Sequence, residues 1–174
     1  MYKKIVAAGL GLAALTLAPY SAGASKSGNE VRVEDRCEPA SFNAAVGPGT
    51  CVGNGTTTFA EFAEDLNPVD FGDDHWRFQA SGSSIERGES IRVINKGGEA
   101  HSFTEVAAYG GGCVEELNIP LGLTPVPECD NPANFPGGLI APLGGTVEVS
   151  GLARGTHHFL CLIHPWMRTD VVVK

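Results

Sequence analysis

The sequence predicts an all-β fold, a Greek-key β-sandwich, and two observations carry that prediction. From His75 onward, apolar and polar residues alternate with the two-residue period of strands, and glycine-containing turns separate the runs after a few residues each. No internal repeat and no nucleotide-binding loop interrupts this pattern. Short strands joined by tight turns favour a sandwich over an α/β fold.

The beginning of the chain has the pattern of an export signal. Lys3 and Lys4 precede an apolar run from Ile5 to Ala18, and small residues follow at Ala22–Ala24. The apolar run is shorter than the roughly 20 residues that span a bilayer. We therefore predict that residues 1–24 are a cleaved signal peptide. The mature chain would be periplasmic or extracellular, without stable membrane insertion.

Length and charge limit the size of the protein and its partners. A chain of 174 residues with 43% hydrophobic residues can form one cored domain with an appendage. The formal net charge of the full sequence is −8 at pH 7. Cleavage after residue 24 would remove the positive charges of Lys3 and Lys4 and make the mature chain still more acidic. Nucleic acid is a poor partner for such a chain, because binding its phosphates requires positive charge. A neutral or basic protein partner fits better.

Residues 25–74 are predicted to be an N-terminal extension that contains one short helix. The polar stretch 25–38 fits either a short edge strand or an irregular start. Thr58 followed by Glu61 forms a capping box, which starts a helix. After it, apolar residues recur with the period of an amphipathic helix that packs on the main domain. These residues are Phe59, Phe62, Ala63 and Leu66.

Residues 75–174 are predicted to be the main domain. Residues 110–145 interrupt it with glycine and proline, so we expect an irregular insertion pinned by a disulfide. Strands are expected at 75–80, 84–86, 90–95, 100–106, 146–149, 156–161 and 170–173.

Five cysteines in an exported chain allow two disulfides and leave one thiol over. The four upstream cysteines form two local groups, so the simplest of the three connectivities is Cys37 with Cys51 and Cys113 with Cys129. Cys161 then remains unpaired. Because a free thiol is a liability under oxidising conditions, metal ligation is a good reason for a chain to keep one.

The stretch around Cys161 contains the donor atoms of a copper site. Cys161, His164 and Met167 place a thiolate, an imidazole and a thioether in one short loop, a soft set that suits copper. His101 lies 60 positions upstream, after the Gly97-Gly98 break, where a strand end can bring it to the same pole of the sandwich. Such a site serves both Cu(I) and Cu(II) without large rearrangement. We predict that these four residues bind one copper ion. The alternatives are a buried thiol, a surface histidine and a core methionine.

These residues resemble the cupredoxins, the blue copper proteins related to plastocyanin and amicyanin. The resemblance covers residues 75–174 and rests on the stretch from Asn95 to His101 and on Gly155-x-x-x-Phe-x-Cys-x-x-His-x-x-Met167, whose short ligand loop looks like that of amicyanin. It implies a cupredoxin-like sandwich in which His101, Cys161 and His164 are equatorial ligands and Met167 is the axial ligand. It also implies that His164 is an exposed edge through which electrons leave.

Two positions depart from the family pattern. His157 stands where the family often has the tyrosine of a tyrosine corner, and Ser102 stands where an asparagine often braces the cysteine loop. His157 is four residues before Cys161 on the same strand, so we expect it to point inward as a hydrogen-bonded residue and not as a ligand.

The resemblance implies an exported, monomeric type 1 copper protein that carries one electron between redox protein partners, which would dock near His164 and Trp166. We do not expect an enzyme, because oxidases of this type carry histidines on both sides of the cysteine and this chain has Leu160 and Leu162. The alternative is a copper delivery or sequestration protein. Against it, Met167 is the only methionine after the predicted leader.

Overall fold

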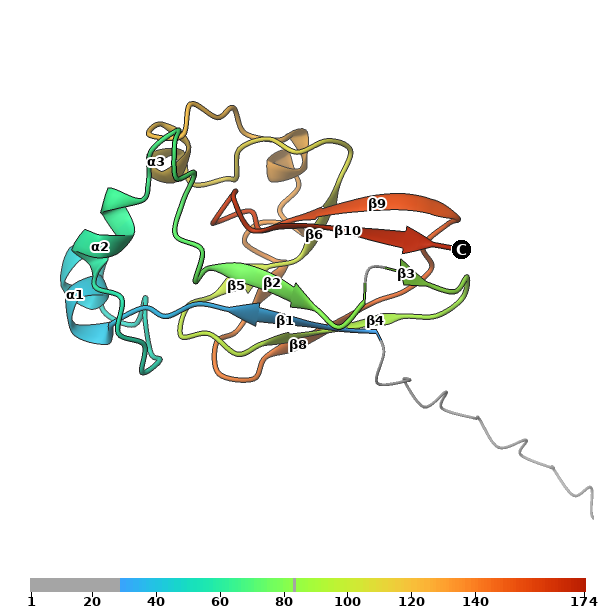
Figure 1. The fold of residues 1–174 in the computed structure, drawn as a ribbon, viewed down its shortest axis with the longest axis horizontal. Helices are drawn as coiled ribbons and strands as arrows, with labels where there is room; N and C mark the ends of the chain where they lie inside the picture. The colour runs from blue at the N-terminus through green and yellow to red at the C-terminus, as the bar shows by residue number, and fades with distance from the viewer. Residues whose placement is uncertain (1–28, 83) are drawn as a thin grey trace, which may run out of the picture.

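Two four-stranded sheets face each other in the computed structural model, which describes residues 29–82 and 84–174 (Figure 1). The first sheet has the order β2 (Arg77–Ala80), β1 (Glu30–Glu34), β4 (Ile91–Asn95) and β8 (Thr146–Val149). The second has the order β3 (Ser84–Ile85), β10 (Arg168–Val173), β9 (Gly155–Leu160) and β6 (Thr104–Val106). A third pair joins β5 (His101–Ser102) to β7 (Leu139–Ile140). The predicted β-sandwich is confirmed.

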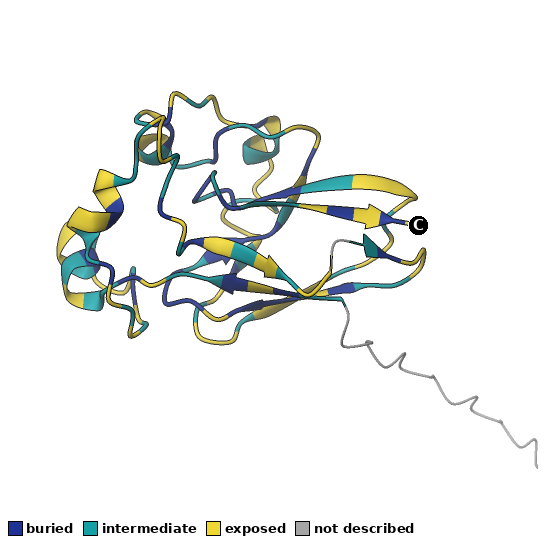
Figure 2. Cartoon of the chain, viewed as in Figure 1, coloured by how far each residue is buried: buried dark blue, intermediate teal, exposed yellow. Residues whose placement is uncertain are grey.

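The core lies between the two sheets, where the strands present alternate residues inward (Figure 2). Val31 and Val33 of β1 are buried, and the exposed Arg32 lies between them. Phe103 and Phe159 stack with their ring centroids 4.3 Å apart. Burial of each such side chain stabilises the fold by about 1.5 to 3 kcal/mol.

Strand β1 joins the N-terminal segment to the sandwich. The sequence was compatible with either an edge strand or an irregular start at residues 25–38. In the structure, β1 lies inside its sheet, between β2 and β4. It runs parallel to β4 and antiparallel to β2, so that Val31 has both Val93 and Ala80 as partners. The residue that follows β1, Asp35, therefore reaches the end of the sandwich where β5 begins.

Helices gather at that same end of the sandwich (Figure 1). They are α1 (Pro39–Ala45), α2 (Phe59–Glu64) and α3 (Glu115–Asn118), and a 3-10 helix spans Pro127–Asp130. Helix α2 and its capping box are confirmed, and its Phe62 is buried against the core. Helix α1 was not predicted, because its short sequence is followed by a dense run of glycine and proline. Glu38 caps it by accepting from the N–H groups of Ala40 and Ser41.

Both predicted disulfides, Cys37–Cys51 and Cys113–Cys129, are present, and Cys161 is the free, buried cysteine. The first disulfide closes the loop that carries α1. The second lies in the insertion, which is irregular apart from α3, the 3-10 helix and β7. Within the part of the chain that the structure describes, no helix has the length and hydropathy needed to cross a bilayer. The predicted signal peptide at residues 1–24 lies outside that part.

His157 replaces a tyrosine corner with a hydrogen-bonded imidazole. Its Nδ1 lies 2.6 Å from Oε1 of Glu105, and its Nε2 lies 2.8 Å from the carbonyl oxygen of Ala153, four residues upstream. Both partners are acceptors, so the protonated ring satisfies both contacts. The expected hydrogen-bonded role is confirmed, and His157 ties β9 both to β6 and to the turn before it.

We expect this contact to make stability depend on pH. Hydrogen bonds to Glu105 and Ala153 raise the pKa of His157 above its ordinary value of 6.5. The folded state therefore holds the proton more tightly than the unfolded state. This contribution is complete below pH 6.5 and is lost as the pH rises through the raised pKa. Because Glu105 is half exposed, the contribution is at most about 1 kcal/mol. Urea unfolding of the chain and of a His157→Gln variant from pH 5 to 9 measures it, and equal pH slopes would contradict it.

Candidate metal centre

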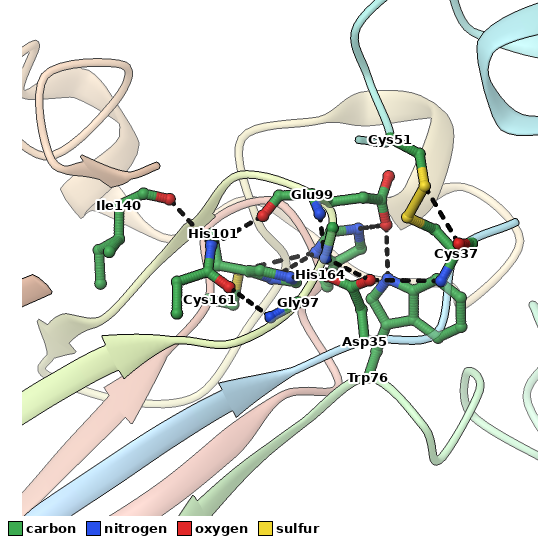
Figure 3. A network of polar contacts seen from close by, with 12 residues as sticks. Asp35, Cys37, Cys51, Trp76, Gly97, Glu99, His101, Ile140, Cys161 and His164 are labelled. Atoms are coloured by element: carbon green, nitrogen blue, oxygen red, sulfur yellow. Dashed lines mark hydrogen bonds and ion pairs between the residues drawn. A yellow bond between two sulfur atoms is a disulfide. The ribbon is translucent and has the colours of Figure 1, made fainter. Parts of the chain in front are cut away.

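Three buried side chains meet at the helical end of the sandwich. Nδ1 of His101 and Nδ1 of His164 lie 3.2 Å apart, and Sγ of Cys161 lies 3.7 Å from the first and 3.8 Å from the second. His101 and Cys161 are fully buried, and His164 is 2% exposed. These three predicted ligands, which come from β5 and from the loop after β9, therefore form one cluster (Figure 3).

The size of this triangle fits one transition-metal ion. The point equidistant from the two nitrogens and the sulfur lies about 2.1 Å from each, and metal bonds to imidazole nitrogen and thiolate sulfur measure roughly 2.0 to 2.3 Å. Two imidazoles with a thiolate form the donor set of a type 1 copper site. The cluster thus fits the ion that the sequence predicts.

The surroundings of Cys161 favour the thiolate, which is the form that binds metal. Burial alone would raise the pKa of the thiol, but hydrogen bonds and positive charge from His101 and His164 lower that pKa well below its usual value. The N–H of Ser102 lies 3.5 Å from the sulfur and adds a donor. The environment of Cys161 thus stabilises its thiolate form.

Met167 completes the ligand loop through its backbone. Its N–H donates to the carbonyl of His164 at 2.9 Å, and its carbonyl accepts from the N–H of Cys161 at 3.1 Å. Its side chain is 1% exposed and belongs to the main core cluster. The loop is therefore closed and rigid, and the axial role of the thioether remains a prediction.

Asp35 is a site residue that the sequence did not reveal. Its Oδ2 lies 2.9 Å from Nε2 of His101, and the two side chains are 1% and 0% exposed. Burial opposes both charges, yet the contact lowers the pKa of Asp35 to about 2, and Asp35 together with Cys161 raises the pKa of His101 to about 9. A carboxylate at Nε2 holds the proton there and directs Nδ1 toward Cys161, as the outer partners of metal-binding histidines do.

The same carboxylate fixes the turn before His101. Asp35 accepts from the N–H groups of Gly98 at 2.9 Å and Glu99 at 3.0 Å. A side chain at Gly98 would lie 2.8 Å from Sγ of Cys37, and one at Gly97 would collide with Asp35. The Gly97-Gly98 break therefore does more than end a strand, because it allows the N-terminal segment to pack directly on the histidine turn.

Ser102 performs the bracing role that its position in the family pattern assigns to asparagine. Its Oγ accepts from the N–H of Leu162 at 2.8 Å, inside the core. This bond ties the strand of His101 to the residue that follows Cys161. The bond thus connects the ligand loop directly to the histidine strand.

Replacing Ser102 with alanine is expected to lower the free energy of unfolding by about 1 to 3 kcal/mol, because the buried N–H of Leu162 loses its acceptor. Urea denaturation of the metal-free protein measures the change. Ser150→Ala, at an exposed serine, is the matched control and should change little. A Ser102→Ala protein as stable as this control would show that the bond contributes nothing.

The expectation that His164 is an exposed edge is wrong for this chain. Three aromatic rings cover it: the ring centroids of Phe62, Trp76 and Trp166 lie 6.3, 6.4 and 5.4 Å from that of His164. Phe62 belongs to α2, so the N-terminal extension contributes, together with Trp76 and Trp166, to burying this predicted ligand. The sequence predicted the apolar face of this helix but could not show which surface it covers.

Glu99 lies beside His164 on the covered side. Its Oε2 accepts from Nε1 of Trp76 at 2.6 Å and lies 3.7 Å from Nε2 of His164 (Figure 3). Burial raises the pKa of this carboxyl, although His164 and Trp76 act to lower it. Each predicted histidine ligand therefore has a carboxylate on the side away from the cluster, Asp35 for His101 and Glu99 for His164.

A comparison with solved structures finds cupredoxins among the similar proteins. A reduced amicyanin mutant is 19% identical over 52% of this chain and 67% of its own, with a TM-score of 0.33. A purple cupredoxin from Nitrosopumilus maritimus is 16% identical over 83% and 98%, with a TM-score of 0.39. A fern plastocyanin mutant is 17% identical over 83% and 99%, also with a TM-score of 0.39. The similarity is to cupredoxins. No protein-family model and no curated protein matches the chain.

Proposed function

We propose that this protein is an exported type 1 copper protein that carries single electrons between redox partners as a monomer. The buried cluster of His101, Cys161 and His164 is the observation that carries the proposal. Its donor set is soft, its dimensions fit one ion, and its thiol favours the charged form. The signal-like residues 1–24 support export.

A copper ion held by these three residues, with Met167 as the axial donor, would supply a couple between Cu(I) and Cu(II). The chain supplies rigidity. Asp35 orients His101, Ser102 ties the loop to β5, and the Met167 backbone closes the loop. A site that cannot rearrange keeps the same ligands in both oxidation states, which is what fast electron exchange requires.

The remaining histidines support a single-metal carrier over a multicopper enzyme. His75 pairs with Asp73, His157 pairs with Glu105, and His158 pairs with Asp170. Each is therefore engaged with a carboxylate instead of grouped with other imidazoles. Burial of His164 also disfavours rapid copper handover to an acceptor, which a delivery protein requires.

We further propose that redox partners dock near His164 and Trp166. The Trp166 ring contacts that of His164, and its indole N–H donates to the carbonyl of Asp73. The adjacent segment carries the exposed acidic residues Asp70 and Asp74. A neutral or basic partner surface complements this region.

Copper reconstitution tests the proposed function. Addition of Cu(II) to the metal-free protein is expected to produce an intense thiolate-to-copper absorption band at one copper per chain. One-electron reduction should bleach the band, and reoxidation should restore it without loss of copper. The zinc-loaded protein, which has no such band, is the control. Release of copper to a chelator on every reduction cycle would favour delivery, and a missing band would contradict a type 1 site.

A further inference from the structure

A pocket of about 510 Å³ lies among the three helices and reaches the predicted ligand His164. Its volume falls in the range of small-molecule sites, roughly 300 to 1,000 Å³. Apolar side chains from α1, α2, α3 and the ligand loop form most of the wall. They include Phe42, Val46, Phe59, Phe62, Leu117 and Ile163.

Two buried polar groups interrupt this apolar wall, Glu99 and His164, which are 6% and 2% exposed. Oε2 of Glu99 accepts from the indole N–H of Trp76 (Figure 3). Within residues 29–82 and 84–174 no hydrogen bond to its Oε1 is found, and this oxygen is not among the enclosed atoms that lack a partner, so it is open to the pocket. Nδ1 of His164 faces the cluster. Its Nε2 has Glu99 at 3.7 Å, beyond hydrogen-bond distance.

Oε1 of Glu99 can accept a hydrogen bond, and the neighbouring Nε2 of His164 can donate one. A hydroxyl group is complementary to this pair. A hydroxyl can donate to Oε1 of Glu99 and accept from the N–H of His164 at the same time. The phenylalanine rings of the wall suit a flat aromatic body. The exposed Glu116, which also lines the pocket, disfavours anions in a chain whose net charge is −8.

We propose that this pocket binds a neutral phenol-type molecule, with its ring among the helices and its hydroxyl between Glu99 and His164. The site goes beyond the carrier function, because it uses side chains that are in place whether or not copper is bound. A ligand there would touch the edge of a predicted metal ligand that the extension hides from solvent.

Fluorine NMR on the full chain, metal-free and zinc-loaded, tests the proposal with three matched probes: 4-fluorophenol, fluorobenzene and 4-fluorobenzoate. The phenol is expected to bind about tenfold more tightly than fluorobenzene, because its hydroxyl adds hydrogen bonds to Glu99 and His164 inside the pocket. The benzoate should not bind. Because zinc has no redox chemistry here, this result stands or falls separately from the electron-carrier function.

Variants locate the binding. Leu117→Trp fills the pocket and should weaken the binding of 4-fluorophenol at least tenfold. Ile119→Trp lies at an exposed position of the same region, outside the pocket wall, and should leave this binding unchanged. Glu99→Gln should remove the preference for phenol over fluorobenzene, because Trp76 needs the amide oxygen and the amide N–H₂ then faces the ligand. Equal affinity for phenol and fluorobenzene, undiminished phenol binding to Leu117→Trp, or no response to phenol up to about 1 mM would each overturn the proposal.

Discussion

Replacement of Cys161 with serine is expected to abolish the intense visible absorption of the Cu(II) protein. The band arises from charge transfer out of a thiolate, and a serine hydroxyl remains protonated in the same place. The substitution keeps the side chain nearly the same size in a position that is fully buried. His101 and His164 therefore remain, and a weak copper complex without the band is the expected product. Absorption spectra with one equivalent of Cu(II) measure the loss.

Two controls separate loss of the thiolate from loss of the fold. Urea unfolding of the metal-free Cys161→Ser protein should show a cooperative transition, because the disulfides Cys37–Cys51 and Cys113–Cys129 are untouched. Met167→Leu should keep an intense band, since an axial thioether is a weak donor. If the serine variant kept the band, Cys161 could not be the copper thiolate.

Replacement of Asp35 with alanine is expected to destabilise the metal-free protein by about 3 to 5 kcal/mol, the usual cost of removing one partner of a buried ion pair. Four donors lose their acceptor at once: Nε2 of His101 and the N–H groups of Cys37, Gly98 and Glu99. Metal affinity should also fall, by about 10- to 100-fold, because His101 is no longer oriented. Urea unfolding and competition for zinc against a chelator measure the two effects.

Asp35→Asn and Asp74→Ala are the matched controls. Asparagine keeps the size of the side chain and one acceptor oxygen, so it should lose less stability than alanine. Asp74, with a side chain 94% exposed, should give a change within about 0.5 kcal/mol. If Asp35→Ala lost stability but bound zinc as tightly as the unaltered chain, Asp35 would support the fold without orienting the ligand.

Local features of the fold were predictable because each depends on neighbours in sequence. The period of the strands, the Thr58 capping box of α2 and the two disulfides each follow from residues within one short stretch. Helix α1 was missed for the same reason, since its short sequence carries a weaker local signal than the glycine and proline after it. The inner position of β1 was not predictable, because its neighbours, β2 and β4, lie more than 40 residues away.

For the site, the sequence by itself predicted the donor atoms. Cys161, His164 and Met167 share one loop, the cysteine count leaves Cys161 free, and the Gly97-Gly98 break precedes His101. Donor chemistry depends on residue type and short spacing, which a sequence displays directly. The structure then brought His101, Cys161 and His164 into one triangle.

Only the tertiary structure decided the surroundings of those donors. Asp35 reaches His101 across 66 positions of sequence, and Glu99 and Trp76 meet beside His164. Helix α2 helps to bury a predicted ligand that the family resemblance expected at the surface. None of these residues carries a local signal of its role. Which carboxylate meets which imidazole, and which face a helix covers, depends on how β1 and the N-terminal segment pack on the sandwich, and that packing is a property of the whole fold.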